Sequence, residues 1–244
     1  MKRFALLAFV LTACGAADDD LGAALPSVAT VSIGLPSAAD TQQPAELWLV
    51  TRRTADTLNG MIAGVVGQMG RALAGPVTPP LSPVTFRVVA ARAAGGVAYR
   101  LEVKPKQAGD EAYVPVAEGV AADDGHSGEV HIDLAALRAL DPGAPSGGDA
   151  LSVGYDVTPA ETHLALALDE ANYGYVQRAA GSGDLAFRGP DGAIRSRWLG
   201  SGAGRAEVDG GAVAVECWDD QFRRVFFAGP AGVVGDPAAC PDVP

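Results

Sequence analysis

The feature that most constrains the fold is an alternation of apolar and polar residues, which begins after Pro83 and continues through most of the remaining chain. In Val97–Lys104, one face of an extended chain carries Val, Tyr, Leu and Val, and the other carries mainly Arg, Glu and Lys. A period of two predicts β-strands, and strands with one polar face are typical of antiparallel sheets. Turn signals such as Gly95-Gly96 and Asp191-Gly192 separate the runs. A meander of about nine to eleven strands is therefore the economical topology.

A helical period precedes this alternation. From about Glu46 to Ala74, apolar residues recur every three or four positions, which predicts one long amphipathic helix that ends at Gly75-Pro76. Four glycines lie inside this helix, and each costs about 1 kcal/mol relative to alanine. We therefore expect this side of the helix to pack closely onto the sheet. The four are Gly60, Gly64, Gly67 and Gly70.

These two patterns together predict an α+β fold dominated by β-structure. A long sheet with one apolar face must cover that face, and curling around the helix is the simplest way to do so. We expect one domain over residues 46–244, in which the N-terminal helix packs on a strongly curved antiparallel meander or partial barrel. In outline, this architecture resembles the periplasmic lipoprotein carriers of the LolA/LolB type.

The N-terminus has the layout of an export signal. Met1-Lys2-Arg3 is basic, and the apolar run Phe4–Leu11 is too short to span a bilayer. Leu11-Thr12-Ala13-Cys14 resembles the lipobox of bacterial lipoproteins. The resemblance implies a signal peptide over residues 1–13, cleavage before Cys14 and acylation of its sulfur and usually its amino group, although a plain secretory signal is an alternative. The residue after the cysteine is Gly15 and not aspartate. By the sorting rule of enteric bacteria, this resembles a lipoprotein that is sorted to the outer membrane.

The segment after the signal peptide predicts a tether, and the net charge of the chain limits which partners it can bind. Residues 14–45 are rich in Ala, Asp, Pro and Ser without sustained periodicity, which favours a flexible tether behind the lipidated cysteine. Cleavage would remove Lys2 and Arg3 and leave 16 basic against 29 acidic residues, a formal charge of −13. This acidity and the lack of a basic cluster argue against nucleic acid as a partner. Membrane contact is expected through the lipid anchor alone.

Two further cysteines, Cys217 and Cys240, lie near the C-terminus and 23 positions apart. In an oxidising compartment, the only two unlipidated cysteines of the mature chain are expected to form one disulfide. That bond would hold the C-terminal tail on the last strands. A free-thiol role is the alternative, but the chain has no C-x-x-C pair.

Few residues point to chemistry. Glu129, His131 and Asp133 alternate along one strand with His126 nearby, so they are candidates for a metal site. A solvated strand face is the plainer interpretation. The phosphate loop, the zinc-protease helix and the nucleophile elbow are absent from the sequence. A hydrolase could draw its base from His126, His131 or His163 and its nucleophile from Ser127 or Ser201, but no spacing connects them.

The sequence therefore favours a lipid-anchored protein of the cell envelope, attached to the outer membrane on its periplasmic or its surface face, with a non-enzymatic structural or binding role. No cofactor is expected. The first alternative is a carrier that holds a lipid or other apolar ligand in a cavity between helix and sheet. The second alternative is an envelope hydrolase.

Overall fold

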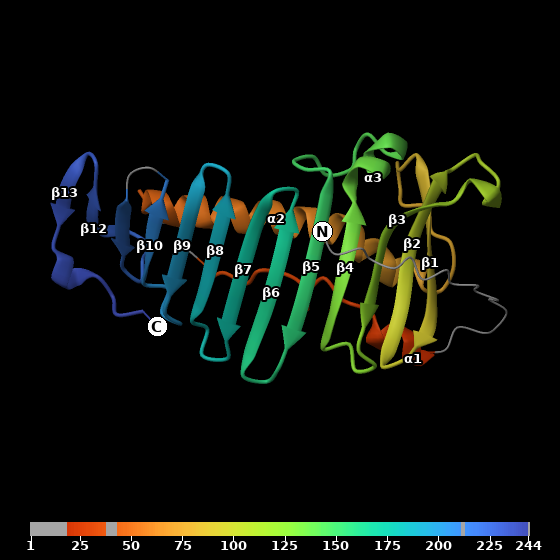
Figure 1. Ribbon diagram of the computed structural model, residues 1–244, viewed down its shortest axis with the longest axis horizontal. Helices are drawn as coiled ribbons and strands as arrows, with labels where there is room; N and C mark the ends of the chain where they lie inside the picture. The colour runs from red at the N-terminus through yellow and green to blue at the C-terminus, as the bar shows by residue number, and fades with distance from the viewer. Residues whose placement is uncertain (1–18, 38–42, 211–212, 244) are drawn as a thin grey trace.

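The fold is built on one antiparallel sheet of 13 strands in which every strand pairs with the next along the chain. The computed structural model describes residues 19–37, 43–210 and 213–243. The sheet is open, with β1 at one edge and β13 at the other (Figure 1). The strands are β1 Val84–Ala93, β2 Gly96–Pro105, β3 Val114–Ala121, β4 Ser127–Asp133, β5 Ala150–Val157, β6 Glu161–Leu168, β7 Ala171–Arg178, β8 Gly183–Gly189, β9 Gly192–Trp198, β10 Gly204–Asp209, β11 Ala214–Trp218, β12 Arg224–Gly229 and β13 Gly232–Gly235. The predicted meander is confirmed, whereas its strand count was too low.

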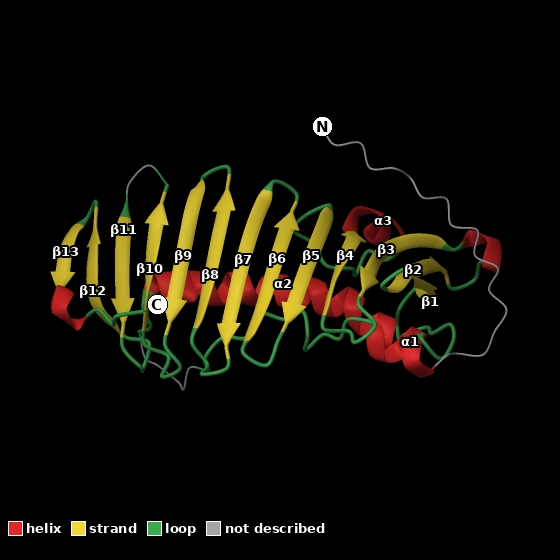
Figure 2. Ribbon diagram, turned by 60° about the horizontal axis from the view of Figure 1, so that its bottom comes forward, coloured by secondary structure: helices red, strands yellow, loops and turns green. Residues whose placement is uncertain are grey.

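Helices cover one face of this sheet. They are α1 Asp19–Ala24, α2 Glu46–Ala72 and α3 Leu134–Leu140. The chain also has two short 3-10 turns, η1 Asp110–Ala112 and η2 Pro237–Ala239. The predicted long helix corresponds to α2, which has 27 residues and is therefore about 40 Å long. It runs across the strands, along the length of the sheet (Figures 1 and 2).

The direction of α2 explains why the predicted partial barrel does not form. A sheet wraps around a helix when successive strands are placed around the circumference of the helix, but here each strand crosses the helix axis and successive strands are placed along that axis (Figure 2). Thirteen strands spaced by about 4.8 Å make a sheet about 58 Å wide, which is wider than α2 is long. The β1–β3 end turns away from the plane of the other strands (Figure 2).

The core lies between α2 and the inward-facing residues of the strands. Every third or fourth residue of α2 is buried, as the sequence pattern predicted. The inward rows of the sheet meet in register, for example Leu151 with Leu168 and Leu164 with Tyr175. Large side chains that are almost fully buried fill the layer between helix and sheet; they include Trp48, Trp198, Trp218, Tyr175, Leu58, Ile62 and Met69.

The packed body begins earlier in the chain than the sequence suggested. Residues 19–37, which belonged to the expected flexible tether, pack on the same face as α2, with Val31 fully buried. Asn59 of α2 accepts a hydrogen bond from the Ile33 amide at 2.8 Å and donates one to its carbonyl at 2.9 Å. Tyr175 binds the amide and the carbonyl of Gly34 in the same way. Side-chain hydrogen bonds to an irregular backbone hold this segment in place. Its sequence therefore has no periodic pattern of apolar residues from which the packing could be predicted.

The glycines of α2 do not face the sheet, contrary to the expectation from the sequence. A Cβ at Gly64 would lie 3.0 Å from Pro145, in the loop between α3 and β5, and one at Gly67 would meet Val28 at 3.7 Å. Nothing lies within 4 Å of such an atom at Gly60 or Gly70. The closest approach to this side of α2 therefore comes from loops, while the larger side chains face the strands.

Strands near the C-terminus fix the first turn of α2. The amide of Leu47 donates to the Glu216 carboxylate of β11, a side chain with no exposed surface that also accepts from the Arg224 guanidinium. Trp48 stacks on Phe222 with ring centroids 4.5 Å apart. A helix begins with backbone amides that lack partners, and a buried carboxylate satisfies one of them here.

Candidate functional site

The predicted lipidation site lies outside the described residues. This holds for Cys14 and for the lipobox residues Leu11, Thr12 and Ala13. Across residues 19–37, 43–210 and 213–243, no helix has the length and hydrophobicity needed to cross a bilayer. The anchor remains a prediction from the sequence.

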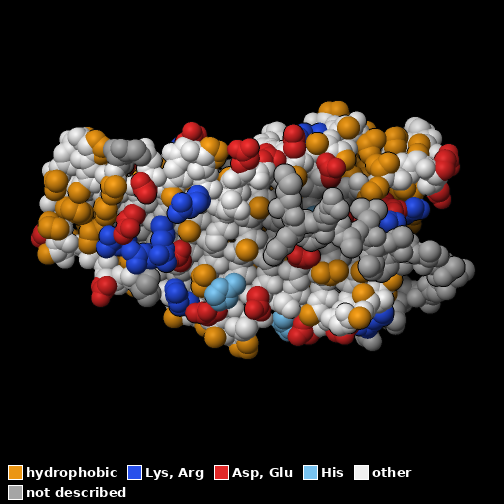
Figure 3. All heavy atoms as spheres, viewed as in Figure 1, with side chains coloured by type: hydrophobic (Ala, Val, Ile, Leu, Met, Phe, Trp, Pro, Cys, Tyr) orange, Lys and Arg blue, Asp and Glu red, His pale blue; other side chains and the backbone are white. Residues whose placement is uncertain are grey.

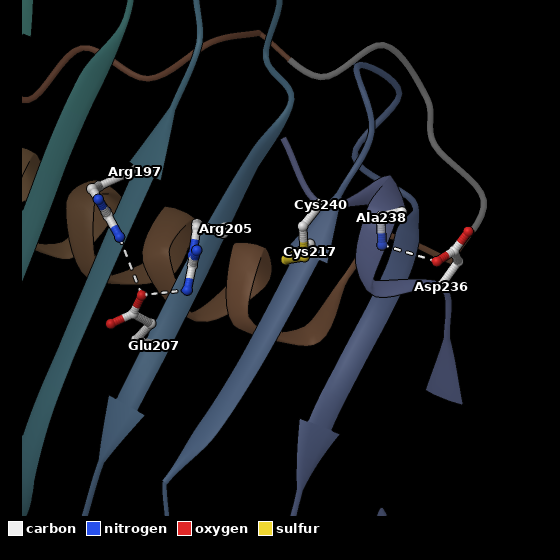
Figure 4. Close-up of a disulfide and its surroundings, with 7 residues drawn as sticks. All are labelled: Arg197, Arg205, Glu207, Cys217, Asp236, Ala238 and Cys240. Carbon is white, nitrogen blue, oxygen red and sulfur yellow. Dashed lines mark hydrogen bonds and ion pairs between the residues drawn. A yellow bond between two sulfur atoms is a disulfide. The ribbon is translucent and has the colours of Figure 1, made fainter. Parts of the chain in front are cut away.

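The predicted disulfide between Cys217 and Cys240 is confirmed, with Cα atoms 5.3 Å apart. It joins β11 to the residue after η2 (Figure 4). Cys217 pairs across the sheet with Arg205 and points to the face that lacks helices. The chain after Cys240 continues on this face, where Arg197 donates a hydrogen bond to the carbonyl of Val243 at 3.4 Å. The disulfide therefore holds the C-terminal tail on the helix-free face.

The candidate metal ligands do not converge. Asp133 caps α3, because its carboxylate accepts a hydrogen bond from the Ala136 amide at 2.7 Å. His126 lies 3.4 Å from Asp124. The Nε2 atom of His131 lies 3.8 Å from the Glu129 carboxylate. Within the described part of the chain, no three His, Cys, Asp or Glu side chains are grouped so that they could hold a metal ion.

His131 instead contacts Ser152, a residue that no sequence pattern marked as a candidate. The two are cross-strand partners on β4 and β5, with Nδ1 2.8 Å from Oγ. With Glu129, they have the composition of a hydrolytic triad. However, β4 and β5 are both interior strands, so the amides around Ser152 belong to the sheet ladder and cannot stabilise an oxyanion. The pairing register of β4 and β5 would have indicated this pair, but the sequence alone does not contain it.

The other hydrolase candidates remain separate. His163 lies 2.8 Å from the Glu161 carboxylate, on the same strand. No hydrogen bond joins Ser127 or Ser201 to a histidine among the bonds of the described residues. The structure therefore does not assemble a Ser, His and acid set from the residues that the sequence nominated.

Two adjoining hollows mark the helix-free face of the sheet. Small residues on four neighbouring strands stand in one cross-strand row and form the floor; they are Gly154, Ala165, Gly174 and Ala186. One hollow extends from this row over β5–β9 and has a volume of about 690 Å³. The other extends over β7–β10 and has a volume of about 620 Å³. Because both hollows include Gly174, Ala186 and Arg195, they make one continuous depression, named here the outer groove.

Arginines border the outer groove on several sides. Arg178 lines the first hollow, Arg188 the second, and Arg195 lies where they meet. Arg188 stands beside Asn172 and is thus about 20 Å from Arg178 along the strand direction. The space-filling view shows Lys and Arg side chains gathered over β8–β10 on this face (Figure 3). The gathering stands out because the whole chain has a formal charge of −11.

Acidic side chains neutralise part of this cluster. Asp184 accepts hydrogen bonds from Nε and Nη2 of Arg195 at 2.7 and 2.5 Å, and this bonding raises the pKa of Arg195. Glu207 is shared by Arg197 and Arg205, at 3.1 and 2.6 Å (Figure 4). Two cations on one carboxylate leave positive charge in excess at this point.

Several guanidinium donors on this face lack acceptors. Nη1 of Arg178 and Nε of Arg205 are buried atoms without a hydrogen-bond partner among the described residues. Arg188 is exposed, and no ion pair of the described residues includes it. A ligand can reach the exposed Arg188 but not the two buried atoms. Because an exposed guanidinium without a partner favours carboxylate or phosphate oxygens, Arg188 gives the outer groove a group that can bind anions.

The helix side of the sheet offers less room. An apolar hollow of about 260 Å³ lies where the segment Leu25–Val28 passes beside Gly67 and Gly70 of α2. This volume is below the range of about 300 to 1,000 Å³ that is usual for small-molecule sites. The space between α2 and the strands is occupied by the buried side chains of the core.

Comparison with known proteins gives no relative: no family model, curated protein or solved structure matches the chain.

Proposed function

We propose that this chain is a lipid-anchored protein of the cell envelope that acts without catalysis, by holding an extended anionic ligand in the outer groove. The anchor is the acylated Cys14, and Gly15 after it favours the outer membrane. Two or three acyl chains give stable membrane attachment where one would not. The order of the chain is then lipid, a short linker and the sheet.

The observation that carries this proposal is the difference between the two faces of the sheet. One face is covered by α2 and residues 25–37, and it is packed with apolar side chains. The opposite face bears the outer groove, whose floor is glycine and alanine and whose border is arginine. Small residues allow a ligand to approach the backbone closely, and the exposed guanidinium of Arg188, which no ion pair of the described residues includes, can bind an acceptor from outside the chain.

The ligand is expected to be a linear molecule with repeated carboxylate groups, such as an acidic polysaccharide. The groove crosses β5–β10, and at about 4.8 Å per strand this is a length of about 24 Å. Three separate arginines along it favour several spaced charges over one compact anion. Two of them are already paired within the chain, Arg178 with Glu161 and Arg195 with Asp184, so a ligand carboxylate would share them with these partners. Asp156 and Asp209 border the same groove, so a ligand that is dense in charge would also meet repulsion.

Calorimetric titration with short oligogalacturonates tests this binding. We expect saturable binding by the purified chain, which weakens as the salt concentration rises because the contacts are between exposed charges. A chain carrying Arg178→Ala and Arg188→Ala should bind at least about tenfold more weakly. Arg52→Ala is the matched control, since it removes an exposed arginine from α2, away from the groove. No binding, or equal loss in the control variant, would overturn the proposal.

The anchor requires a test of its own. Intact-mass analysis of the protein from native membranes should show a chain that begins at Cys14 and carries acyl chains. A Cys14→Ser variant should leave the membrane fraction or keep its signal peptide. An unmodified Cys14 in membrane-derived protein would remove the assigned location, yet it would leave binding in the outer groove open.

A carrier function makes the opposite prediction about the ligand. Lipid that co-purifies with the protein, or uptake of a fluorescent fatty acid, would support a site on the helix side of the sheet. We expect neither, because the core between α2 and the strands is filled. A Gly67→Leu variant, which would occupy the small hollow beside Val28, should leave oligogalacturonate binding unchanged.

A further inference from the structure

The last strand leaves one edge of the sheet uncovered. β13 pairs only with β12, and residues 225–235 at this end contain no charged side chain. Val233 and Val234 are 70% and 62% exposed. Hydrophobic side chains gather over β12 and β13 in the space-filling view (Figure 3). Proteins normally protect an edge strand with charges or proline, but β13 has neither within its four residues.

The opposite edge of the sheet is protected. Val77 forms two antiparallel hydrogen bonds of 2.8 Å with Phe86 of β1, and Thr78 lies 2.7 Å from Thr85. β1 also carries the charged residue Arg92, which is paired with Asp123. The fold therefore covers the β1 edge and leaves the β13 edge available for strand pairing.

The helix layer does not reach this end of the sheet. α2 contacts β9, β10 and β11, and its first residue, Glu46, lies beside Arg224 at the start of β12. The cross-strand row of Glu216, Phe227 and Val234 lies on the helix side of the sheet. At Phe227 and Val234 this row has passed the end of α2. Phe227 is half-buried, with the Arg224 guanidinium over its ring, and Val234 is exposed.

The hairpin register determines which backbone groups of β13 point outward. The two-residue turn Pro230-Ala231 closes on Gly229 and Gly232. In an antiparallel ladder, hydrogen-bonded and non-hydrogen-bonded pairs alternate, so Gly232 and Val234 direct their N–H and C=O groups toward β12. The corresponding groups of Val233 and Gly235 then point away from the sheet.

We propose that β13 pairs antiparallel with β13 of a second copy of this chain, around a two-fold axis at Val234. In this register Val233 faces Gly235 of the partner and Gly235 faces Val233, so four N–H···O=C bonds form. Val234 lies opposite its own copy, with Phe227 of each chain beside it on the helix side. An antiparallel pair of identical strands is self-complementary, and the two-fold axis closes it as a dimer.

Charge favours a second copy as the occupant. The chain is strongly acidic, so two copies repel each other over most of their surfaces. Residues 225–235 form an end of the molecule without charge, where that repulsion is weakest. The pairing joins two sheets edge to edge, with α1 of each copy at the far ends (Figure 1). Because the contact is one short strand and a few apolar side chains, we expect a weak dimer that depends on concentration.

Disulfide trapping tests the register directly. In a non-hydrogen-bonded antiparallel pair the Cα atoms are about 4.5 Å apart, within the range that a disulfide spans. The full chain with Val234→Cys, purified from membranes in a neutral detergent, should therefore form a covalent dimer on mild oxidation. Val213→Cys is the control, because Val213 is equally exposed (68%) but lies between β10 and β11. Equal cross-linking of both variants, or none in Val234→Cys, would overturn the proposal.

A backbone variant separates strand pairing from apolar contact. Val233→Pro removes an outward N–H group that β12 does not use, so the monomer should keep its fold and melting temperature. Sedimentation of the full chain should show a monomer–dimer equilibrium whose dissociation constant rises at least about tenfold in this variant. A wild-type chain that stays monomeric at every concentration, or an unaffected dimer in Val233→Pro, would contradict the proposed pairing.

Discussion

Replacement of Glu216 should destabilise the protein more than replacement of any exposed charged residue. Its carboxylate has no exposed surface, and it accepts hydrogen bonds from the Leu47 amide and the Arg224 guanidinium. In Glu216→Ala, the Leu47 amide loses its acceptor at the start of α2, and Arg224 loses its buried partner. A buried donor left without an acceptor costs about 1 to 3 kcal/mol, and a lost hydrogen bond to a charged group costs about 1.5 to 3 kcal/mol, so we expect a loss of about 4 kcal/mol in the free energy of unfolding.

This loss converts to a melting temperature through the entropy of unfolding. At about 2.1 cal/mol/K per residue, a chain of 244 residues has an unfolding entropy near 0.5 kcal/mol/K, and the shift is about 8 °C. Glu216→Gln keeps an oxygen for the Leu47 amide and loses only the charge opposite Arg224. We expect it to cost about 1 to 2 kcal/mol, or about 2 to 4 °C.

Differential scanning calorimetry of the two variants measures both shifts. Asp56→Ala serves as the control, because its ion pair with Arg52 on α2 is exposed and should contribute less than about 1 kcal/mol. Two results would refute the reasoning. One is a shift in Glu216→Ala no larger than that of the control. The other is an equal shift in the Ala and Gln variants, which would mean that the cap on Leu47 contributes nothing.

Four further predictions concern the disulfide, the two pH limits and the histidine pair. Cys240→Ser should lower the free energy of unfolding by about 3 kcal/mol, from the chain entropy of the 23-residue loop, and an unchanged melting temperature would contradict this. Burial tends to raise the pKa of Asp219, but hydrogen bonds from Arg223 and Gln221 outweigh it and hold the pKa below its usual range. Its stabilisation is therefore present above about pH 4 and lost in more acidic solution, so the difference in melting temperature between wild type and Asp219→Asn should shrink there. Burial raises the pKa of Tyr175 to about 12; since a free tyrosine titrates near 10, stability should fall as the pH rises from about 10 to 12, and phenolate absorbance should appear together with unfolding. Ser152→Ala should leave any ester hydrolysis by the chain unchanged, because no oxyanion site adjoins the His131 pair, and a large loss of turnover would indicate a working hydrolase.

The elements that the sequence predicted correctly are those with a local signal. The three-to-four spacing of apolar residues predicted α2 to within two residues of its end, and alternation predicted strands such as β2 and β5. The pairing of Cys217 with Cys240 was predicted because the third cysteine, Cys14, was expected to be lipidated, and the disulfide is present. In each case the prediction rests on a pattern within one segment, or on the only pairing of cysteines that was left.

The features that were missed depend on contacts between distant segments. β12 and β13 show no alternation of apolar and polar residues, because the helix layer ends before this end of the sheet and no buried face is distinguished from a solvent face there. The packing of residues 19–37 rests on Asn59 and Tyr175, which bind backbone groups without a sequence pattern. The floor of the outer groove joins residues such as Gly154 and Ala186 only through the register of four strands. The same register brings Ser152 to His131.

The most direct test of the account is to map the bound ligand by nuclear magnetic resonance. Backbone amide shifts of the isotope-labelled chain would be followed while trigalacturonic acid is added. The account predicts that the largest changes occur at the floor of the outer groove, at Gly154, Gly174 and Ala186, and that Gly67 and Gly70 on α2 stay unchanged. Shifts confined to α2, or no shifts anywhere in the sheet, would contradict it.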